Sequence, residues 1–314
     1  MDGSIILQVV LLLVGFVFLI KGSDFFVDGA SSIASLLKIP TIIVGLTIVA
    51  FGTSAPEAAV SITSSLTGSN AMAVSNVIGS NLFNILMVIG VSALLGDLLM
   101  EKSVLNKDLP FLVGITLLFT AFIIIGWNIT QIEGIILLLI LVGYVYYLIR
   151  GARKSKDANV VEDAKLTPLK SAIFIIVGLA GIILGGDLVV NSASDIAIAL
   201  GMSETLVGLT IVAIGTSLPE LVTSLTALKK GENQIVIGNV IGSNIFNILF
   251  VLGASSAISQ IPLDSSMLID VVFMIAVTIL CFIFGKTQDK YDKKEGIILV
   301  ALFIAYMAFA ILRN

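Results

Sequence analysis

The sequence predicts an all-α integral membrane protein with ten transmembrane helices, arranged as two inverted five-helix repeats with both termini outside. Three observations lead to this fold class. The 314 residues are 58% hydrophobic and only 12% charged, whereas roughly a quarter of the residues of a soluble domain are charged. The basic residues gather in alternate connections between apolar runs, and the second half of the chain repeats the first.

Ten apolar segments are long enough to cross a bilayer, which takes about 20 residues of helix. They cover residues 4–35, 40–66, 71–95, 109–126, 129–150, 169–199, 204–228, 234–258, 267–285 and 294–312. The first and the sixth are too long for a perpendicular span. We therefore expect these two helices to tilt or to extend past the bilayer.

The basic residues indicate the orientation, because cytoplasmic loops collect Lys and Arg. Fifteen of the seventeen lie in odd-numbered loops: Lys38, Lys102, Lys107, Arg150, Arg153, Lys154, Lys156, Lys165, Lys170, Lys229, Lys230, Lys286, Lys290, Lys293 and Lys294. The opposite side has only Arg313, and Lys21 falls within the first helix. We therefore expect the odd loops in the cytoplasm, both termini outside, and a multi-pass protein of the plasma membrane.

An internal repeat divides the chain. Glu220 follows Glu57 by 163 residues, and from Gly22 to Ser92 this offset needs no gap and leaves about half of the positions identical. Residues 1–150 and 168–314 are expected to form two five-helix repeats joined by a cytoplasmic linker at 151–167. Because five is odd, the second repeat enters the membrane upside down, and inverted repeats of this kind place substrate at the midplane between the halves.

The first duplicated motif is Gly52-Thr-Ser-Ala-Pro-Glu57, which recurs as Gly215-Thr-Ser-Leu-Pro-Glu220. Residues four apart share a helix face, so in each copy the Thr lies over the Glu with the Ser beside it. An ionisable residue within a membrane is costly and indicates a functional site. The candidate ligands are Thr53, Ser54 and Glu57 in the first copy and Thr216, Ser217 and Glu220 in the second.

The proline of each copy has no backbone N–H, so we expect the helix to kink there. Unwound backbone at membrane depth is tolerated only where it is buried in protein or lines a wet cavity. The carbonyls of Ala50 and Gly52, and those of Ala213 and Gly215, are expected to be freed and to act as oxygen ligands.

The second duplicated motif is Gly-Ser-Asn-x-x-Asn, at 79–84 and at 242–247. It lies on the helix that follows each glutamate helix, and its Ser and its last Asn are four residues apart. We therefore expect Ser80, Asn84, Ser243 and Asn247 to be ligands.

Other duplicated polar residues are interpreted as structural. Asn81 and Asn244 are expected to form hydrogen bonds between helices, as are small and polar residues at many membrane helix contacts. Asn76 and Asn239 lie one turn earlier on about the same face. Asp24 and Asp187 are expected to be interfacial or helix-packing residues without a binding role.

The donor set contains carboxylates, hydroxyls, amides and carbonyls, all of which are hard oxygen ligands. Such a set suits Ca²⁺ or Na⁺ and suits copper or zinc poorly. The chain has no histidine and a single cysteine, Cys281, which excludes zinc–histidine sites, Ser–His dyads and internal disulfides. Two buried carboxylates repel each other strongly, and one divalent or two monovalent cations would neutralise both.

These motifs resemble those of the cation/Ca²⁺ exchanger superfamily, most closely its Na⁺/Ca²⁺ exchanger branch. The resemblance implies an antiporter that works by alternating access, usually with three Na⁺ for one Ca²⁺, and a gate formed by sliding of the first and sixth helices. By position, it implies as ligands Glu57, Glu220, Thr53, Ser54, Thr216, Ser217, Ser80, Ser243, Asn84 and Asn247, and the carbonyls of Ala50 and Ala213.

K⁺-dependent members of the family rely on an acid where this chain has Asn84 or Asn247, so we predict no K⁺ requirement. One Ca²⁺ would neutralise the two carboxylates while three Na⁺ would leave about one positive charge, so exchange is expected to be electrogenic. The expected partners are Ca²⁺, Na⁺ and the lipid bilayer. We expect no nucleic acid, no cofactor and no enzymatic activity, and a functional monomer.

Three other functions remain as alternatives. A Ca²⁺/H⁺ exchanger would use the same two glutamates as proton carriers. A cation channel would usually need several subunits around an axis, whereas an inverted repeat supplies a closed pair of sites. An intramembrane protease would use Ser54 or the Asp24/Asp187 pair, but the chain has no histidine to activate a serine.

Overall fold

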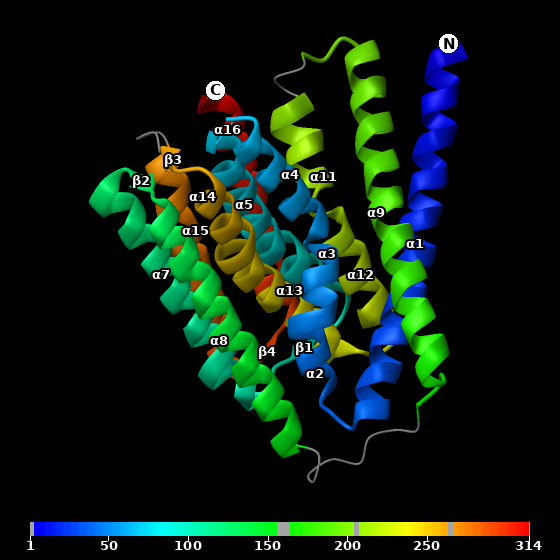
Figure 1. The fold of residues 1–314 in the computed structure, drawn as a ribbon. Coiled ribbons are helices and arrows are strands. Elements are labelled where there is room, and N and C mark those ends of the chain that lie inside the picture. The colour runs from blue at the N-terminus through cyan, green and yellow to red at the C-terminus, as the bar shows by residue number, and fades with distance from the viewer. Residues whose placement is uncertain (1–2, 69, 156–163, 204–206, 263–266, 314) are drawn as a thin grey trace.

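The computed structural model describes residues 3–68, 70–155, 164–203, 207–262 and 267–313. These residues form a bundle of long helices (Figure 1). Both termini lie at one end of the bundle, and the end of α8 and the start of α9 lie at the other. The chain therefore runs from one end of the bundle to the other an even number of times between its two termini.

The first half of the chain has five helical segments. They are α1 (Gly3–Leu37); the broken segment α2 (Thr41–Val44), π-helical turn η1 (Gly45–Val49), α3 (Ala50–Thr53) and α4 (Ala55–Leu66); α5 (Asn70–Phe83), η2 (Asn84–Ile89) and α6 (Gly90–Leu95); η3 (Val104–Asp108) and α7 (Leu109–Gly126); and α8 (Gln131–Ser155). The turns η2 and η3 are also π-helical.

The second half repeats this order of elements. They are α9 (Pro168–Ala199); η4 (Gly208–Val212), α11 (Ala213–Gly215) and α12 (Leu218–Lys229); α13 (Asn233–Phe246), η5 (Asn247–Leu252) and α14 (Gly253–Ile258); α15 (Met267–Gln288); and α16 (Lys293–Arg313). The turns η4 and η5 are π-helical and lie 163 residues after η1 and η2.

Within the described ranges, eight helices are long and apolar enough to cross a membrane, or nine if the bent pair Thr41–Thr53 and Ala55–Leu66 is one span. The segment expected at 204–228 begins outside the described residues, and its described part is helical from Gly208 to Lys229 with a break before Leu218. Ten spans and outside termini therefore stay predictions. The unusual length expected of the first and sixth helices is confirmed, at 35 and 32 residues.

Two expected boundaries are wrong. The fourth segment begins not at 109 but at Val104, in the π-helical turn η3 that runs directly into α7. The fifth runs past 150 to Ser155, because the helix continues through the basic residues that follow its apolar part. In both cases the helix extends beyond the apolar window from which its ends were predicted.

The distribution of side chains is the reverse of that in a soluble protein, where charged residues are almost never fully buried unless paired. Glu57, Glu220 and Asn239 are fully buried, whereas Leu13 is 60% exposed and Ile125 is 82% exposed. Apolar side chains thus cover the outside of the bundle, as expected of a surface that faces lipid. Every residue from Ile235 to Phe246 in α13 is buried, so this helix forms the centre of the bundle.

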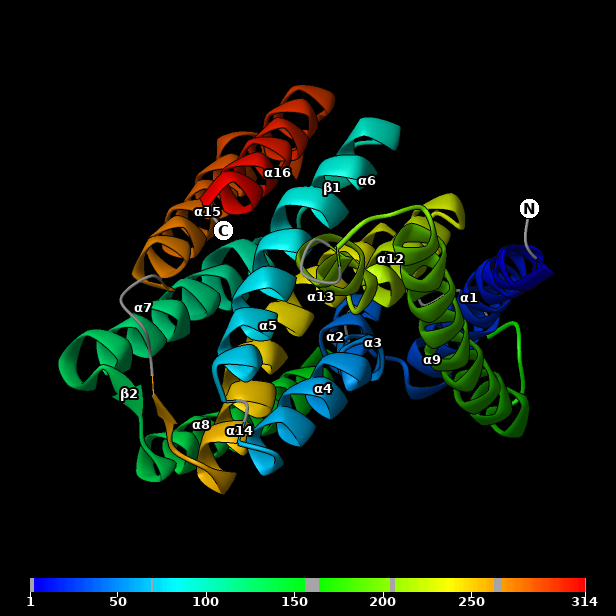
Figure 2. The same ribbon diagram turned by 90° about the horizontal axis from the view of Figure 1, so that it is seen from above.

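α1 and α9 form an antiparallel pair at one edge of the bundle, side by side in both views (Figures 1 and 2). Glycines allow their backbones to touch. A Cβ atom on Gly22 would lie 2.7 Å from the backbone nitrogen of Ile182, and one on Gly178 would lie 2.5 Å from that of Phe26. Close approach of helices at small residues is a common way of packing within membranes.

Ion pairs connect α1 to the turn between α12 and α13. The Lys230 Nζ lies 2.8 Å from Asp28 Oδ1 and 3.6 Å from Asp24 Oδ1. Ser31 donates a hydrogen bond to the Glu232 carboxylate in the same turn. Asp24 is therefore a packing residue between α1 and this turn, as expected from the sequence.

Two short antiparallel ribbons connect the halves of the chain. β1 (Leu98–Leu99) pairs with β4 (Lys290–Tyr291), and β2 (Asn128–Ile129) pairs with β3 (Ile261–Pro262). Beside the first ribbon, a hydrogen bond to Asp97 at 2.6 Å raises the pKa of Lys290. Each ribbon thus joins a connection of the first half to one of the second.

The contact between α1 and α9 leads to a first prediction. Gly178→Ala should destabilise the protein by about 1–3 kcal/mol, because the added methyl group collides with the backbone of α1, which cannot move aside like a flexible side chain. The measurement is thermal unfolding of the purified protein in detergent.

The matched control is Gly114→Ala on α7, because a Cβ atom there would meet none of the described residues within 4 Å. Replacing a helical glycine with alanine in open space should leave the unfolding temperature unchanged or raise it. Equal unfolding temperatures for the two variants would contradict the backbone contact.

Candidate cation-binding site

The two duplicated motifs meet in the interior where two broken helices face each other. α3 ends at Thr53 and α4 begins at Ala55, with Ser54 between them at φ −84° and ψ 7°, and the axis bends by 47°. In the second copy the corresponding residue is Ser217, at φ −96° and ψ 6°, just before α12. In both copies the chain leaves the helix at the serine of the motif.

Each break places a glutamate in the first turn of a new helix, Glu57 in α4 and Glu220 in α12. The N-terminal turn favours a negative charge, because its backbone N–H groups point toward it and the helix dipole is positive there. Pro56 and Pro219 occupy the start of these helices, where a missing N–H costs nothing.

The break differs from the expected kink. It lies at Ser54, two residues before Pro56, because the proline begins the next helix rather than interrupting one. The Ala50 carbonyl is not freed as predicted: it accepts a hydrogen bond from the Ser54 N–H at 3.0 Å. It nevertheless faces the site, since the hydroxyls of Thr53 and Ser243 both lie 3.4 Å from it, and a carbonyl oxygen has two lone pairs.

Hydrogen bonds cross between the two motifs. Ser54 Oγ donates to Glu220 Oε1 at 3.1 Å, and Ser217 Oγ donates to Glu57 Oε1 at 3.1 Å. Ser80 Oγ lies 3.4 Å from the same Glu57 oxygen. Each carboxylate is therefore bound by the serine of the other half of the chain, which brings the two copies of the motif together.

Several buried oxygens of the site have no hydrogen-bond partner among the described residues. They are Glu57 Oε2, Glu220 Oε2, Asn84 Oδ1 and Asn247 Oδ1, and the Asn84 amide nitrogen is also unpaired. A buried polar group without a partner costs about 1–3 kcal/mol. A water or an ion is one explanation for such a group, and the oxygens named here belong to residues that were predicted from the sequence to be ligands.

Asn84 and Asn247 each begin a π-helical turn, η2 and η5. A π-helical turn inserts one extra residue into the helix and is frequent at functional sites. These turns could not be predicted from the sequence, because the residues that follow each Asn are ordinary apolar residues. Once the π-helical turn at Asn84 is known, the 163-residue offset predicts the second turn at Asn247.

The interhelical hydrogen bonds predicted for Asn81 and Asn244 are confirmed in part. Asn81 Oδ1 accepts a hydrogen bond from Asn247 Nδ2 at 3.1 Å, so Asn81 holds a candidate ligand across the interface between helices. Asn244 instead donates to Val240 O in its own helix at 3.0 Å and makes no hydrogen bond to another helix that is described. The interhelical contact predicted for both is thus found for Asn81 alone.

The remaining hydroxyls lie in two clusters that are not equally closed. Thr53, Ser243 and Asn239 are fully buried together, with Thr53 Oγ1 3.4 Å from Ser243 Oγ. Thr216 is only half-buried and lies 3.5 Å from Asn76 Oδ1. Among the described residues, no three acidic, Cys or His side chains come together, so a cation here would be held by two carboxylates and by neutral oxygens.

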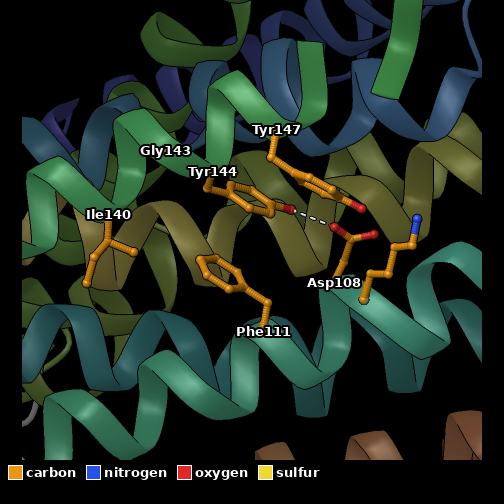
Figure 3. Close-up of a pocket in the computed structure, with 7 residues that line it drawn as sticks. Asp108, Phe111, Ile140, Gly143, Tyr144 and Tyr147 are labelled. Atoms are coloured by element: carbon orange, nitrogen blue, oxygen red, sulfur yellow. Dashed lines mark hydrogen bonds between the residues drawn. The ribbon is translucent and has the colours of Figure 1, made fainter. Parts of the chain in front are cut away.

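A separate cavity of about 520 Å³ lies between α7 and α8, away from the two motifs (Figure 3). It is lined by Lys107, Asp108, Phe111, Ile140, Gly143, Tyr144 and Tyr147. Tyr144 donates to Asp108 at 3.0 Å and stacks on Phe111. In the second half, Tyr306 makes the same hydrogen bond to Asp270 at 3.1 Å, so this pair stabilises a hairpin in each half.

Comparison with known proteins places the chain in a family. The family model described as sodium/calcium exchanger protein matches residues 7–150 and 170–312. The chain is 40% identical to an antiporter, CaxA, of Alkalimonas amylolytica over 95% of the chain and 96% of the relative. It is 32% identical to the sodium/calcium exchanger MaX1 of Methanosarcina acetivorans over 95% of the chain and 96% of the relative.

Solved structures give the same result. The chain superposes on the sodium-calcium exchanger NCX_Mj soaked with Na⁺ and Sr²⁺ with a TM-score of 0.86 and 32% identity, over 97% of this chain and 99% of the other. The same exchanger soaked with zero Na⁺ and Ca²⁺ gives a TM-score of 0.86 and 30% identity, over 98% and 99% of the two chains. Because the family model covers nearly the whole chain and these likenesses extend end to end, this multi-pass membrane protein belongs to the sodium/calcium exchanger family of cation transporters.

Proposed function

We propose that the protein is a secondary antiporter of the plasma membrane that exchanges Na⁺ for Ca²⁺ at the site between the two motifs. The observation that carries the proposal is the pair of buried carboxylates, Glu57 and Glu220, each bound on one oxygen by the opposite serine and unpaired on the other. Two unpaired carboxylate oxygens amid neutral oxygen donors suit a hard cation. Ca²⁺ takes 6–8 oxygen ligands in flexible geometry.

The proposed ligands are oxygen donors drawn from both halves of the chain. They are the side chains of Glu57, Glu220, Thr53, Ser54, Thr216, Ser217, Ser80, Ser243, Asn84 and Asn247, and the carbonyls of Ala50 and Ala213. The unpaired oxygens of the two glutamates and two asparagines support this set. The crossed serines support it as well, because a hydroxyl that donates to a carboxylate keeps two lone pairs for a cation.

The ratio of three Na⁺ for one Ca²⁺, which the resemblance implies, would make the exchange electrogenic. Glu57 and Glu220 supply two negative charges if both are ionised. One Ca²⁺ neutralises them, and three Na⁺ exceed them by one positive charge. Exchange of three Na⁺ for one Ca²⁺ therefore moves one net charge across the membrane, and a membrane potential should drive it. The amides of Asn84 and Asn247 add no charge, which favours a site that needs no K⁺.

An asymmetry between repeat-related positions supports alternating access. A Cβ atom on Gly242 would lie 2.6 Å from the Ala50 Cβ, whereas one on Gly79, the counterpart 163 residues earlier, would meet no described residue within 4 Å. The Thr53 cluster is fully buried and the Thr216 cluster is half-buried. Nearly identical sequence is therefore more deeply buried on one side of the site than on the other, and exchange of the two arrangements would expose the ions to each side in turn.

Transport in proteoliposomes tests the proposed function. Vesicles loaded with Na⁺ and diluted into Na⁺-free, K⁺-free buffer should take up ⁴⁵Ca²⁺, because outward Na⁺ movement drives inward Ca²⁺ movement. In a second arm with external K⁺, valinomycin should stimulate uptake by making the interior positive, and K⁺ without valinomycin should have no effect. Uptake that follows only an imposed pH gradient would instead identify a Ca²⁺/H⁺ exchanger.

Substitution of the glutamates tests the site. Glu57→Gln and Glu220→Gln should each reduce Ca²⁺ uptake at least about a hundredfold. Each removes a carboxylate that would pair with the buried cation, and removing one partner of a buried ion pair costs on the order of 3 kcal/mol or more. Glutamine keeps the shape and can still accept the serine hydrogen bond, so thermal unfolding should show a folded protein. Wild-type uptake by either variant would rule out a site with two carboxylates, and Gly114→Ala serves as the control with unaltered transport.

A further inference from the structure

Two asparagines outside the proposed ligand set occupy matching positions beside it. Asn239 lies on α13, one turn before Ser243, and is fully buried. Asn76 lies on α5, one turn before Ser80, and is half-buried. They are related by the 163-residue offset. Both make three hydrogen bonds, and the pattern of the three is the same.

In each case the amide nitrogen binds its own half of the chain. Asn239 Nδ2 donates to the Glu220 carbonyl at 3.3 Å and to Ser224 Oγ at 3.0 Å. Asn76 Nδ2 donates to the Glu57 carbonyl at 3.2 Å and to Ser61 Oγ at 2.9 Å. The asparagine is therefore attached to the backbone of the glutamate and to a serine one turn later in the same helix.

The amide oxygen binds the other half of the chain. Asn239 Oδ1 lies 3.0 Å from Thr53 Oγ1, and Asn76 Oδ1 lies 3.5 Å from Thr216 Oγ1. Both threonines belong to the proposed ligand set. The two asparagines thus cross the interface in opposite directions, each from the glutamate of one half to the threonine of the other.

The chemistry of these groups determines which atom donates each proton. A backbone carbonyl can only accept, so the atom of Asn239 that faces the Glu220 carbonyl must be the NH₂ group. The atom that faces Thr53 is then the amide oxygen, which also can only accept. The Thr53 hydroxyl must therefore donate its proton to Asn239, and the same logic applies to Thr216 and Asn76.

From this geometry we infer that Asn239 and Asn76 are positioning residues that orient the Thr53 and Thr216 hydroxyls, so that both lone pairs of each oxygen face the transported cation. The inference rests on the proposed function, because it treats the two threonines as cation ligands. It assigns to the asparagines no contact with the ion. They hold the hydroxyl proton away from the site and tie its direction to the glutamate of the other half.

Without the asparagine, the Thr53 proton has two other acceptors, and both lie within the site. The Ala50 carbonyl and Ser243 Oγ are each 3.4 Å from Thr53 Oγ1. A proton directed at either oxygen would occupy a lone pair that a cation would otherwise use. Loss of Asn239 should therefore weaken cation binding even though the residue does not touch the ion.

A double-mutant cycle separates this role from simple packing. The variants are Asn239→Leu, Thr53→Val and the two together, and the readouts are the Kd of ⁴⁵Ca²⁺ and the Na⁺ concentration that halves its binding to the purified protein. The cycle is evaluated for the cation whose binding is weakened by Thr53→Val. Each single variant should weaken the binding of that cation roughly tenfold, which corresponds to the loss of one charge-assisted contact.

The double variant should weaken binding about as much as either single variant, because an asparagine has nothing to orient once the hydroxyl is gone. A product of the two single effects, roughly a hundredfold, would mean that Asn239 acts through packing alone, and it would overturn the inference while the proposed function stands. If Thr53→Val weakens the binding of neither Ca²⁺ nor Na⁺, Thr53 is not a ligand and the inference is overturned. Absence of Ca²⁺ binding by the wild-type protein would overturn the proposed function itself.

The second half of the pair supplies a further test if Asn239→Leu does not fold. The cycle of Asn76→Leu with Thr216→Val should show coupling of the same sign, but smaller, because the contact is 3.5 Å long and half-buried. Coupling in the opposite direction, or larger than in the Thr53 cycle, would contradict the inference. Ser256→Ala is the control, because this buried hydroxyl donates within its own segment, to Leu252 O at 2.7 Å and Gly253 O at 3.3 Å, and its loss should leave both affinities unchanged.

Discussion

Burial of two carboxylates at one place is the constraint on which the rest of this structure depends. Removing an ion from water costs several kcal/mol even after the protein relaxes, and Glu57 and Glu220 are both fully buried. The two helix breaks place each carboxylate in an N-terminal turn, and the opposite serine supplies a hydroxyl donor. Because each donor comes from the other half of the chain, neither half can form its part of the site alone.

Much of the fold and of the site could be predicted because the membrane and the duplication restrict the choices. Long apolar runs define the helices, and polar residues repeated at the same offset inside them identify the oxygen donors. The break at Ser54 rather than Pro56, and the π-helical turn at Asn84, could not be predicted. These features depend on which hydrogen bonds the neighbouring helices offer, and a single sequence does not record those contacts. The hydrogen bond between Asn239 and Thr53 could not be predicted for the same reason, since the two residues lie 186 positions apart in the sequence.

The two halves carry nearly the same motif, yet they are not in the same environment. Gly242 is packed against Ala50, whereas a Cβ atom on Gly79 would meet no described residue within 4 Å, and the contact of Asn239 with Thr53 is shorter than that of Asn76 with Thr216. On the side of the shorter contact, Lys230 and Glu232 also hold α1 to the turn after α12. The difference cannot come from the motifs themselves, so it must come from how the helices around them are placed. The same short sequence therefore tolerates both a more buried and a less buried arrangement.

The two strand ribbons have a consequence for the covalent structure of the molecule. Each ribbon joins a connection of one half to a connection of the other, and α13 crosses η1 so closely that Gly238 and Gly45 touch through their backbones. None of these contacts involves the stretch between Ser155 and Pro168 that joins the halves. A break in the peptide chain there would leave every one of them in place. In its contacts the protein therefore resembles a dimer of two related subunits, and the peptide link between the halves keeps the two at equal number and high local concentration.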